Sequence, residues 1–287
     1  MSLPVQIVAR DGRDQLGEGL LWSARDNALY WTDILGQRLN RLRLSDDVVD
    51  SWTVPEMIGW VIERRDHRGF VAGLKSGIVA LTLDPFTITP LVAPEPDMPG
   101  NRLNDAVADR WGRIWAGTMP LGCDQPTGSL YMLDTDLSTT RIDTGYTVTN
   151  GPVVSADCDW LYHTDSVPGR IYRFPLDADG NAGSRQDFIT FEAAWGSPDG
   201  MTFDADGGLW VAQWGGAGIS RFTTDGIRDR TIELPASQIT NIAFAGHNLE
   251  RMFVTSAADG VDETHGGALF EVDPQGFCGL PPHQFGG

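Results

Sequence analysis

The stretch SPDGMTFDADGGLWVAQWGG at residues 197–216 holds two short apolar runs joined by a turn rich in Asp and Gly. Counterparts of its second run, LWVAQ (209–213), recur roughly every 40–50 residues. They are LYWTD (29–33), FVAGL (70–74), IWAGT (114–118), LYHTD (161–165) and MFVTS (252–256). Five mostly apolar residues bounded by turn residues are typical of a buried strand rather than a helix.

Each of these runs is preceded and followed by another strand-like run, so one repeat holds about four strands, as in a β-propeller blade. Six repeats predict an all-β chain, a single six-bladed β-propeller over residues 1–287 with four-stranded antiparallel blades around a central channel. PVQIVA (4–9) could pair with the last blade and close the ring, and residues 275–287 look like a loose tail. The alternative is a β-sandwich or a two-domain all-β protein.

The composition excludes several classes of function. Acidic residues outnumber basic ones by 39 to 21, a net charge of −18, which disfavours binding to nucleic acid or to an anionic membrane surface. The three cysteines form no CxxC motif, which argues against a disulfide scaffold and a cysteine-based zinc site. No stretch resembles a signal peptide or a membrane span, so we expect a soluble, cytoplasmic protein.

The first strand of each blade lines the channel of a propeller, so equivalent residues at the start of these strands should meet at one mouth. These residues are Glu18, Gly59, Asn104, Asn150, Asp199 and Asn241. All but Gly59 carry a carboxylate or amide oxygen, the donors that hard divalent cations prefer. Two converging carboxylates would repel without a cation, so a metal site is favoured; the alternative is a set of ordinary turns around a polar mouth.

The last residues of the second strands should form an outer ring at the same mouth. This ring comprises Asp33, Leu74, Thr118, Asp165, Gln213 and Ser256. These residues either orient ligands or substrate or are ordinary polar residues at strand ends. Arg102, close to Asn104, could hold a hydroxylated or anionic ligand, or could pair with a neighbouring acid.

Several motifs in chain order resemble those of the family of senescence marker protein 30, gluconolactonase and luciferin-regenerating enzyme. They are LGEGLLW (16–22), NRLNDAVAD (101–109), WAGTM (115–119), TNGPVVSAD (149–157), YHTDS (162–166) and SPDGMTFDADGGLWVAQWGG (197–216). The resemblance spans about residues 15–275 and is strongest to bacterial sugar lactonases, including xylonolactonases. Members of the family are six-bladed propellers, which agrees with the repeat count.

The resemblance implies that Glu18, Asn150 and Asp199 hold one divalent metal ion, which could be calcium, zinc, manganese or iron(II). It implies that Arg102 and Asn104 contact substrate hydroxyls and that Asp199 also serves as the base. The implied activity is metal-dependent opening of a sugar lactone, such as glucono- or xylonolactone, to an aldonic acid by a monomer or weak oligomer. The loop at 119–128 lacks the glutamate that helps to cover the substrate in animal members, and has Cys123 or Asp124 there, so the substrate stays open.

Two other functions remain as alternatives. A hydrolase of the same fold could act on aryl esters or phosphotriesters, because stabilising an oxyanion does not by itself select a carbonyl centre. The YWTD run at 30–33, echoed by YHTD at 162–165, is also found in propellers that act as binding modules, so a non-catalytic metal-binding propeller is the other alternative. No GxSxG motif is present, and His163, inside a second strand, is either a core residue or a residue of the mouth.

Overall fold

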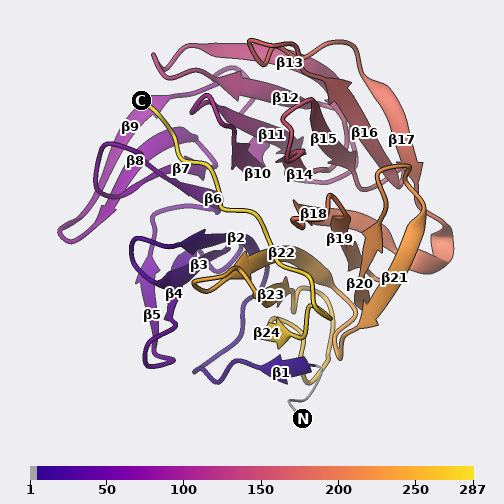
Figure 1. The fold of residues 1–287 in the computed structure, drawn as a ribbon. Coiled ribbons are helices and arrows are strands. Elements are labelled where there is room, and N and C mark those ends of the chain that lie inside the picture. The colour runs from indigo at the N-terminus through magenta and orange to yellow at the C-terminus, as the bar shows by residue number, and fades with distance from the viewer. Residues whose placement is uncertain (1–4) are drawn as a thin grey trace. The chain divides into compact units, whose positions relative to one another are not determined.

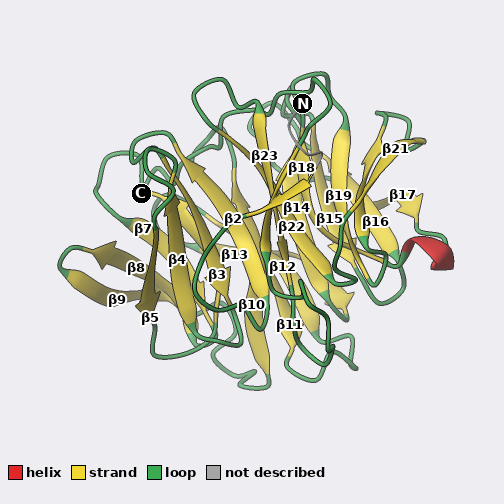
Figure 2. Ribbon diagram, turned by 90° about the horizontal axis from the view of Figure 1, so that it is seen from below, coloured by secondary structure: helices red, strands yellow, loops and turns green. Residues whose placement is uncertain are grey.

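The computed structural model describes residues 5–287, and this part of the chain is built from strands apart from one short 3-10 helix, η1 (Ala193–Trp195). Figure 2 shows the strands and this short helix. The strands form six four-stranded antiparallel sheets. The predicted fold class, an all-β six-bladed propeller, is therefore confirmed.

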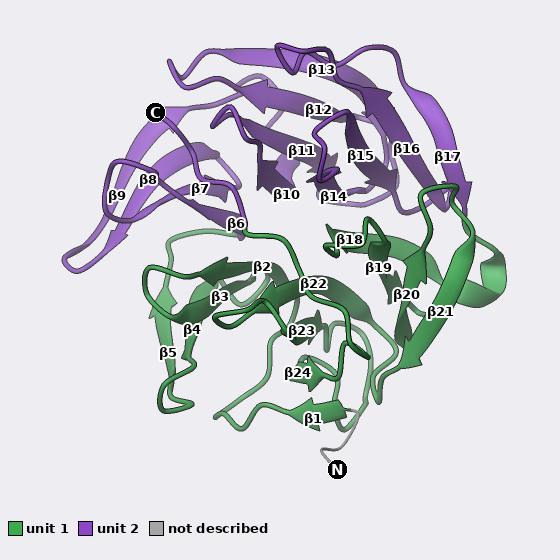
Figure 3. Ribbon diagram, viewed as in Figure 1, with its two compact units in different colours: residues 1–57, 191–281 green, residues 58–190, 282–287 purple. Residues whose placement is uncertain are grey.

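The chain divides into two compact units, one from residues 1–57 and 191–281 and the other from residues 58–190 and 282–287 (Figure 3). Each unit contains three of the six sheets. A single domain over residues 1–287 stays a prediction.

The strands of the first unit are β1 (Val5–Ile7), β2 (Gly17–Ser23), β3 (Ala28–Asp33), β4 (Arg38–Arg43), β5 (Val49–Thr53), β18 (Ser197–Phe203), β19 (Leu209–Trp214), β20 (Gly218–Phe222), β21 (Arg228–Glu233), β22 (Ile239–Ala245), β23 (Arg251–Ser256) and β24 (Leu269–Val272). Their sheets have the orders β2-β3-β4-β5, β18-β19-β20-β21 and β1-β24-β23-β22 (Figure 1). The N-terminal strand thus completes the last sheet, as predicted, although residue 4 of the PVQIVA run lies outside the described residues.

The strands of the second unit are β6 (Ile58–Glu63), β7 (Phe70–Leu74), β8 (Gly77–Leu83), β9 (Phe86–Val92), β10 (Asn101–Ala108), β11 (Ile114–Pro120), β12 (Gly128–Leu133), β13 (Thr139–Tyr146), β14 (Thr149–Val154), β15 (Trp160–Asp165), β16 (Arg170–Pro175) and β17 (Gln186–Thr190). They form the sheets β6-β7-β8-β9, β10-β11-β12-β13 and β14-β15-β16-β17.

The six recurring apolar runs are the second strands of the six sheets, namely β3, β7, β11, β15, β19 and β23. Nearly every residue in them is buried. Strands covered on both faces read as continuous apolar runs instead of alternating ones. The fourth strands, such as β9 and β13, are mostly exposed and alternate less regularly, which explains why the sequence marks them so weakly.

The prediction of a loose tail at 275–287 is wrong. Phe285 is fully buried in a cluster with Trp60, Ile62 and Ile114. Its backbone is held as in a strand, because the N–H of Phe285 donates to the carbonyl of Glu63 and its carbonyl accepts from the N–H of Arg65. A single aromatic residue among glycines and prolines gave no periodic signal from which this packing could be predicted.

Candidate active site

The six predicted channel-mouth residues occupy equivalent places in their sheets. In each sheet the pairing of the first strand with the second shifts register at this residue or directly beside it. The shift lies between Glu18 and Leu21, for example, and between Asn150 and Val153. Such β-bulges turn a side chain out of the alternating pattern and are common next to active sites. The equivalence follows from the sequence, whereas the bulges were not predicted.

Gly59, the one mouth residue without an oxygen, has no room for a side chain. A Cβ atom at this position would lie 2.4 Å from the carbonyl oxygen of Asn104 on the neighbouring strand β10. The close approach of β6 to β10 therefore explains why this position departs from the pattern.

In the first unit, Asn241 lies against Glu18 and against Gly200, the residue next to Asp199. The Nδ2 of Asn241 donates to Oε2 of Glu18 at 3.3 Å. The same amide lies against Gly200, the neighbour of Asp199, where an added Cβ would be 2.5 Å from Nδ2. Both carboxylates are buried, each with only 4% of its surface exposed. Strands β2 and β18 each carry one buried carboxylate, and the Asn241 amide on β22 contacts Glu18 and the backbone next to Asp199.

In the second unit, Arg102, Asn104 and Asn150 form a chain of hydrogen bonds between β10 and β14. Nη1 of Arg102 donates to Oδ1 of Asn104 at 2.5 Å. Nδ2 of Asn104 donates in turn to Oδ1 of Asn150 at 2.8 Å and to the carbonyl of Thr149. Nδ2 of Asn150 donates to Oγ of Ser166, so both ends of the Asn150 amide are oriented.

The structure therefore joins Arg102, Asn104 and Asn150 by hydrogen bonds. Glu18 and Asp199 belong to one unit, whereas Arg102, Asn104 and Asn150 belong to the other. A metal site formed jointly by Glu18, Asn150 and Asp199 stays a prediction.

Asp105 is a buried carboxylate that the sequence reasoning missed. Its Oδ2 accepts from the N–H of Gly151, beside Asn150, and its Oδ1 accepts from the N–H of Ala106. Burial raises the pKa of Asp105 to about 6, and these backbone N–H groups offset only part of that effect. Its position directly after Asn104 could have pointed to Asp105 in the sequence, because a β-bulge lets two neighbouring residues share one face of the sheet.

The two aspartates of the predicted outer ring bind backbone. Asp33 Oδ1 accepts from the N–H groups of Leu16 and Gly36, and Asp165 Oδ1 accepts from the N–H of Val148. Thr118 donates to Glu95, and Ser256 donates to the carbonyl of Ala268. These four side chains thus have hydrogen-bond partners in the protein, and a role in orienting ligands or substrate stays a prediction.

His163 is a core residue and does not join the predicted ligands. Its ring packs edge-on against Tyr146, with 4.6 Å between centroids. Burial lowers its pKa to about 3, so the ring is neutral. Cys123 and Asp124, by contrast, are exposed in the loop after β11.

The donor set suits a hard cation. Glu18, Asp199 and Asn150 offer carboxylate and amide oxygens from buried side chains. Within residues 5–287, no three His, Cys, Asp or Glu side chains gather in a metal-binding cluster. The predicted set, with two carboxylates and one amide, does not require such a cluster.

The first strands of all six sheets are bulged, and five of them carry an oxygen-bearing side chain at the mouth position. This pattern defines a class of propeller, and the comparison with known families agrees. The model of the SMP-30/Gluconolactonase/LRE-like region matches residues 16–258, and the chain belongs to this family. The resemblance inferred from the motifs is therefore confirmed.

Among characterised relatives, the chain is 36% identical to 6-deoxy-6-sulfogluconolactonase of Pseudomonas putida, over 85% of this chain and 84% of that protein. It is 33% identical to a pentonolactonase of Haloferax volcanii, over 90% of this chain and 91% of that protein. A solved regucalcin from Agrobacterium tumefaciens, described as a calcium-binding protein, aligns with a TM-score of 0.91 at 27% identity and covers 97% of this chain and 96% of its own.

The described part of the chain contains no helix with both the length and the apolar character needed to cross a bilayer.

Proposed function

We propose that this protein is a metal-dependent hydrolase that opens sugar lactones to aldonic acids. The observation that carries the proposal is the pair of buried carboxylates, Glu18 and Asp199, at equivalent bulged positions of β2 and β18. Burial of a carboxylate costs free energy unless the charge is paired, and a divalent cation held by both carboxylates would offset this cost. The names of the Pseudomonas and Haloferax relatives, both lactonases, support this class of substrate.

Glu18, Asn150 and Asp199 would hold the cation, and the calcium-binding relative makes calcium the first ion to test, followed by zinc, manganese and iron(II). When bound, such an ion polarises the lactone carbonyl and stabilises the negative charge that develops on its oxygen.

The chain's own residues would supply the remaining functions. Asp199 accepts the proton of the attacking water, and its buried position strengthens this interaction. Arg102 and Asn104 bind the sugar hydroxyls. The hydrogen bond from Asn104 also orients Oδ1 of Asn150, the atom that would face the cation.

The test is a pH-stat assay of the purified chain on a panel of five- and six-membered aldonolactones, with metal-stripped and reloaded protein. We expect activity to disappear on chelation and to return with a divalent ion. The reloaded protein should also melt at a higher temperature, because the ion binds only the folded state.

Each contrary outcome identifies an alternative. Full activity in protein shown to be metal-free would refute the metal requirement. Faster turnover of aryl esters or phosphotriesters than of lactones would favour another class of hydrolase, and metal binding without any hydrolysis would favour a binding module.

We further propose that the protein acts in the cytoplasm as a monomer or weak oligomer on a free small-molecule sugar lactone, without a nucleic-acid or membrane partner. The net charge of −18 supports the last point. The identity of the lactone depends on residues around Arg102, including the loop with Cys123.

A further inference from the structure

A cavity lies in the first unit, and no residue of β2 or β18, the strands that carry Glu18 and Asp199, lines it. Its volume is about 620 Å³, within the range of small-molecule sites. The segment before β2 and the outer strands β4 and β5 line it, with Ala9, Arg10, Asp11, Arg13, Arg38, Asn40, Val49 and Ser51. Three arginines in one cavity are unusual in a chain with only 21 basic residues.

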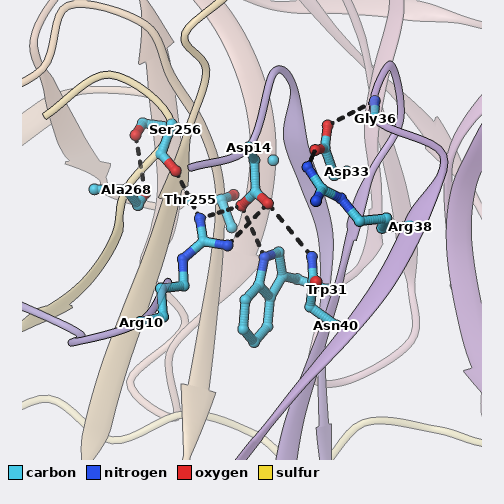
Figure 4. Close-up of polar contacts among 12 residues, drawn as sticks. Arg10, Asp14, Trp31, Asp33, Gly36, Arg38, Asn40, Thr255, Ser256 and Ala268 are labelled. Atoms are coloured by element: carbon cyan, nitrogen blue, oxygen red, sulfur yellow. Dashed lines mark hydrogen bonds and ion pairs between the residues drawn. The ribbon is translucent and has the colours of Figure 1, made fainter. Parts of the chain in front are cut away.

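One wall of this cavity is held by the buried carboxylate of Asp14 (Figure 4). Arg10 donates two hydrogen bonds to Asp14, from Nη1 at 3.0 Å and from Nη2 at 2.6 Å. Trp31 and Asn40 donate to the same carboxylate. Ser51 donates to Oδ1 of Asn40 at 2.8 Å, so the lone pairs of its hydroxyl can accept a hydrogen bond from a ligand. This wall is ordered by contacts from four segments of the chain.

Arg38 has a similar support. Its Nη2 donates to Oδ2 of Asp33 at 3.2 Å, and Asp33 is fixed by the N–H of Gly36 (Figure 4). The side chain of Asp33 is fully buried, whereas 43% of the Arg38 side chain is exposed. Among residues 5–287, Nε of Arg38 is buried and has no hydrogen-bond partner. The Arg38 side chain thus lines the cavity while one of its terminal nitrogens is held by a buried carboxylate.

Arg13 supplies a cation with uncharged partners. Its Nη1 donates to the carbonyls of Glu263 and Thr264. These bonds position the guanidinium without neutralising its charge. An arginine that is already ordered loses less side-chain entropy when it binds an anion.

We propose that this cavity binds a small hydroxylated oxyanion, that is, a sugar-sized molecule carrying a carboxylate or a phosphate. Arg13 and Arg38 bind the oxyanion through charge-assisted hydrogen bonds. Ser51 and the carboxylate of Asp11 accept hydrogen bonds from ligand hydroxyls. Two sources share this chemistry: an aldonate, which is the product class of the proposed reaction, and a sugar phosphate.

The test is titration calorimetry, which measures the binding of small probes to the metal-loaded protein. The probes are gluconate, glucose 6-phosphate, inorganic phosphate and uncharged glucose. We expect saturable binding of gluconate or glucose 6-phosphate, and the stronger of the two identifies the source. Glucose should not bind at this site, because it lacks the oxyanion.

Two variants locate the binding. Arg13→Gln and Arg38→Gln should each weaken binding at least tenfold while lactone hydrolysis continues at the wild-type rate. Arg43→Gln is the matched control, because Arg43 lies on the same strand as Arg38, pairs with Asp46 and does not line the cavity. If Arg38→Gln fails to fold, Arg13→Gln decides the question, since its partners are backbone carbonyls.

Several results would overturn the proposal. They are the absence of saturable binding by either hydroxylated anion, unchanged affinity in Arg13→Gln, and inorganic phosphate binding as tightly as the hydroxylated anions. Hydrolysis is measured on the same samples, so a protein that binds the anion but opens no lactone would refute the proposed function alone.

Discussion

Asp199 is the residue on which the proposed chemistry depends most. It is buried in the bulged part of β18, next to Gly200, and the backbone of Gly200 lies against the amide of Asn241. A carboxylate that both binds a cation and takes a proton needs one oxygen for each task. Cation binding and proton transfer can be separated by a side chain that keeps one oxygen but is not basic.

Asp199→Asn keeps the size of the side chain and one oxygen for the cation, but it removes the basic oxygen. We expect measurable metal binding while kcat falls by about 10²–10⁴, the usual contribution of a general base. Asp199→Ala should lose both metal binding and activity. Calorimetry with the metal and steady-state kinetics on a lactone measure the two effects. A metal-saturated Asp199→Asn variant that turns over at the wild-type rate would remove Asp199 from the role of base.

His163 illustrates a different effect, the linkage of a buried base to acid stability. Within the described residues, neither ring nitrogen has a hydrogen-bond partner, and burial lowers the pKa to about 3. In the unfolded chain a histidine titrates near 6.5. The unfolded state therefore binds a proton that the folded state rejects, and this contribution to stability is complete above about pH 6.5 and declines as the pH falls towards 3.

His163→Leu should flatten the pH dependence of unfolding. Between pH 7.5 and 5 the wild type should lose about 2 kcal/mol more than the variant in the free energy of unfolding. Urea titrations at several pH values measure this difference. His247→Leu, at an exposed position, is the control and should keep the wild-type slope. Equal slopes for His163→Leu and the wild type would show that the ring is protonated in the folded state.

At the scale of the strand, two aspartates hold the starts of the strands that carry the predicted ligands. Asp33, at the end of β3, accepts from the N–H of Leu16, two residues before Glu18. Asp165, at the end of β15, accepts from the N–H groups of Thr147 and Val148, just before Asn150. The final Asp of the YWTD and YHTD runs thus orders the neighbouring first strand.

Asp165→Asn should weaken metal binding, although Asp165 is not itself a predicted ligand. An asparagine offers one acceptor oxygen where two oxygens now accept from backbone N–H groups. We expect metal affinity to fall by about 10–100-fold, as for other residues that orient ligands, with kcat at saturating metal nearly unchanged. Asp157→Asn, in an exposed turn of the same sheet, should have no such effect. If Asp165→Asn binds the metal with wild-type affinity, Asp165 only holds the segment before β14 and does not influence the metal ligands.

Another feature of this scale recurs in two sheets. Asp109 accepts hydrogen bonds from Arg113 and from the indole N–H of Trp115. Asp204 accepts in the same way from Arg221 and Trp210. Each buried carboxylate is thus both paired and hydrogen-bonded, the condition under which burial of a charge is tolerated.

At the scale of the whole chain, the C-terminal segment joins residues distant in sequence. Phe285 packs with Trp60, Ile62 and Ile114, and the N–H of Gly286 donates to the carbonyl of Gly112. These contacts join the C-terminal segment to β6, β11 and the turn at Gly112, so the segment stabilises strands that lie far from it in sequence.

Phe285→Ala should therefore destabilise the protein by about 3–5 kcal/mol, the usual cost of removing a buried phenylalanine. Chemical denaturation measures the change. His283→Ala, at an exposed position two residues earlier, is the control and should change stability little. A loss below about 1 kcal/mol for Phe285→Ala would mean that the segment contributes little to the fold.

The sequence by itself determined the repeat, the six buried second strands, the equivalence of the mouth residues and the family. These properties depend on local pattern, because an apolar run and its turn residues have the same physical meaning wherever they occur. The tertiary structure alone decided the bulges, the missing side chain at Gly59, the raised pKa of Asp105, the packing of Phe285 and the arginine-lined cavity. The bulges arise in the pairing of consecutive strands, where one extra residue leaves the apolar pattern unchanged. The other features result from close approach between segments farther apart in sequence, and the burial and hydrogen bonds formed there have no periodic signature in the chain.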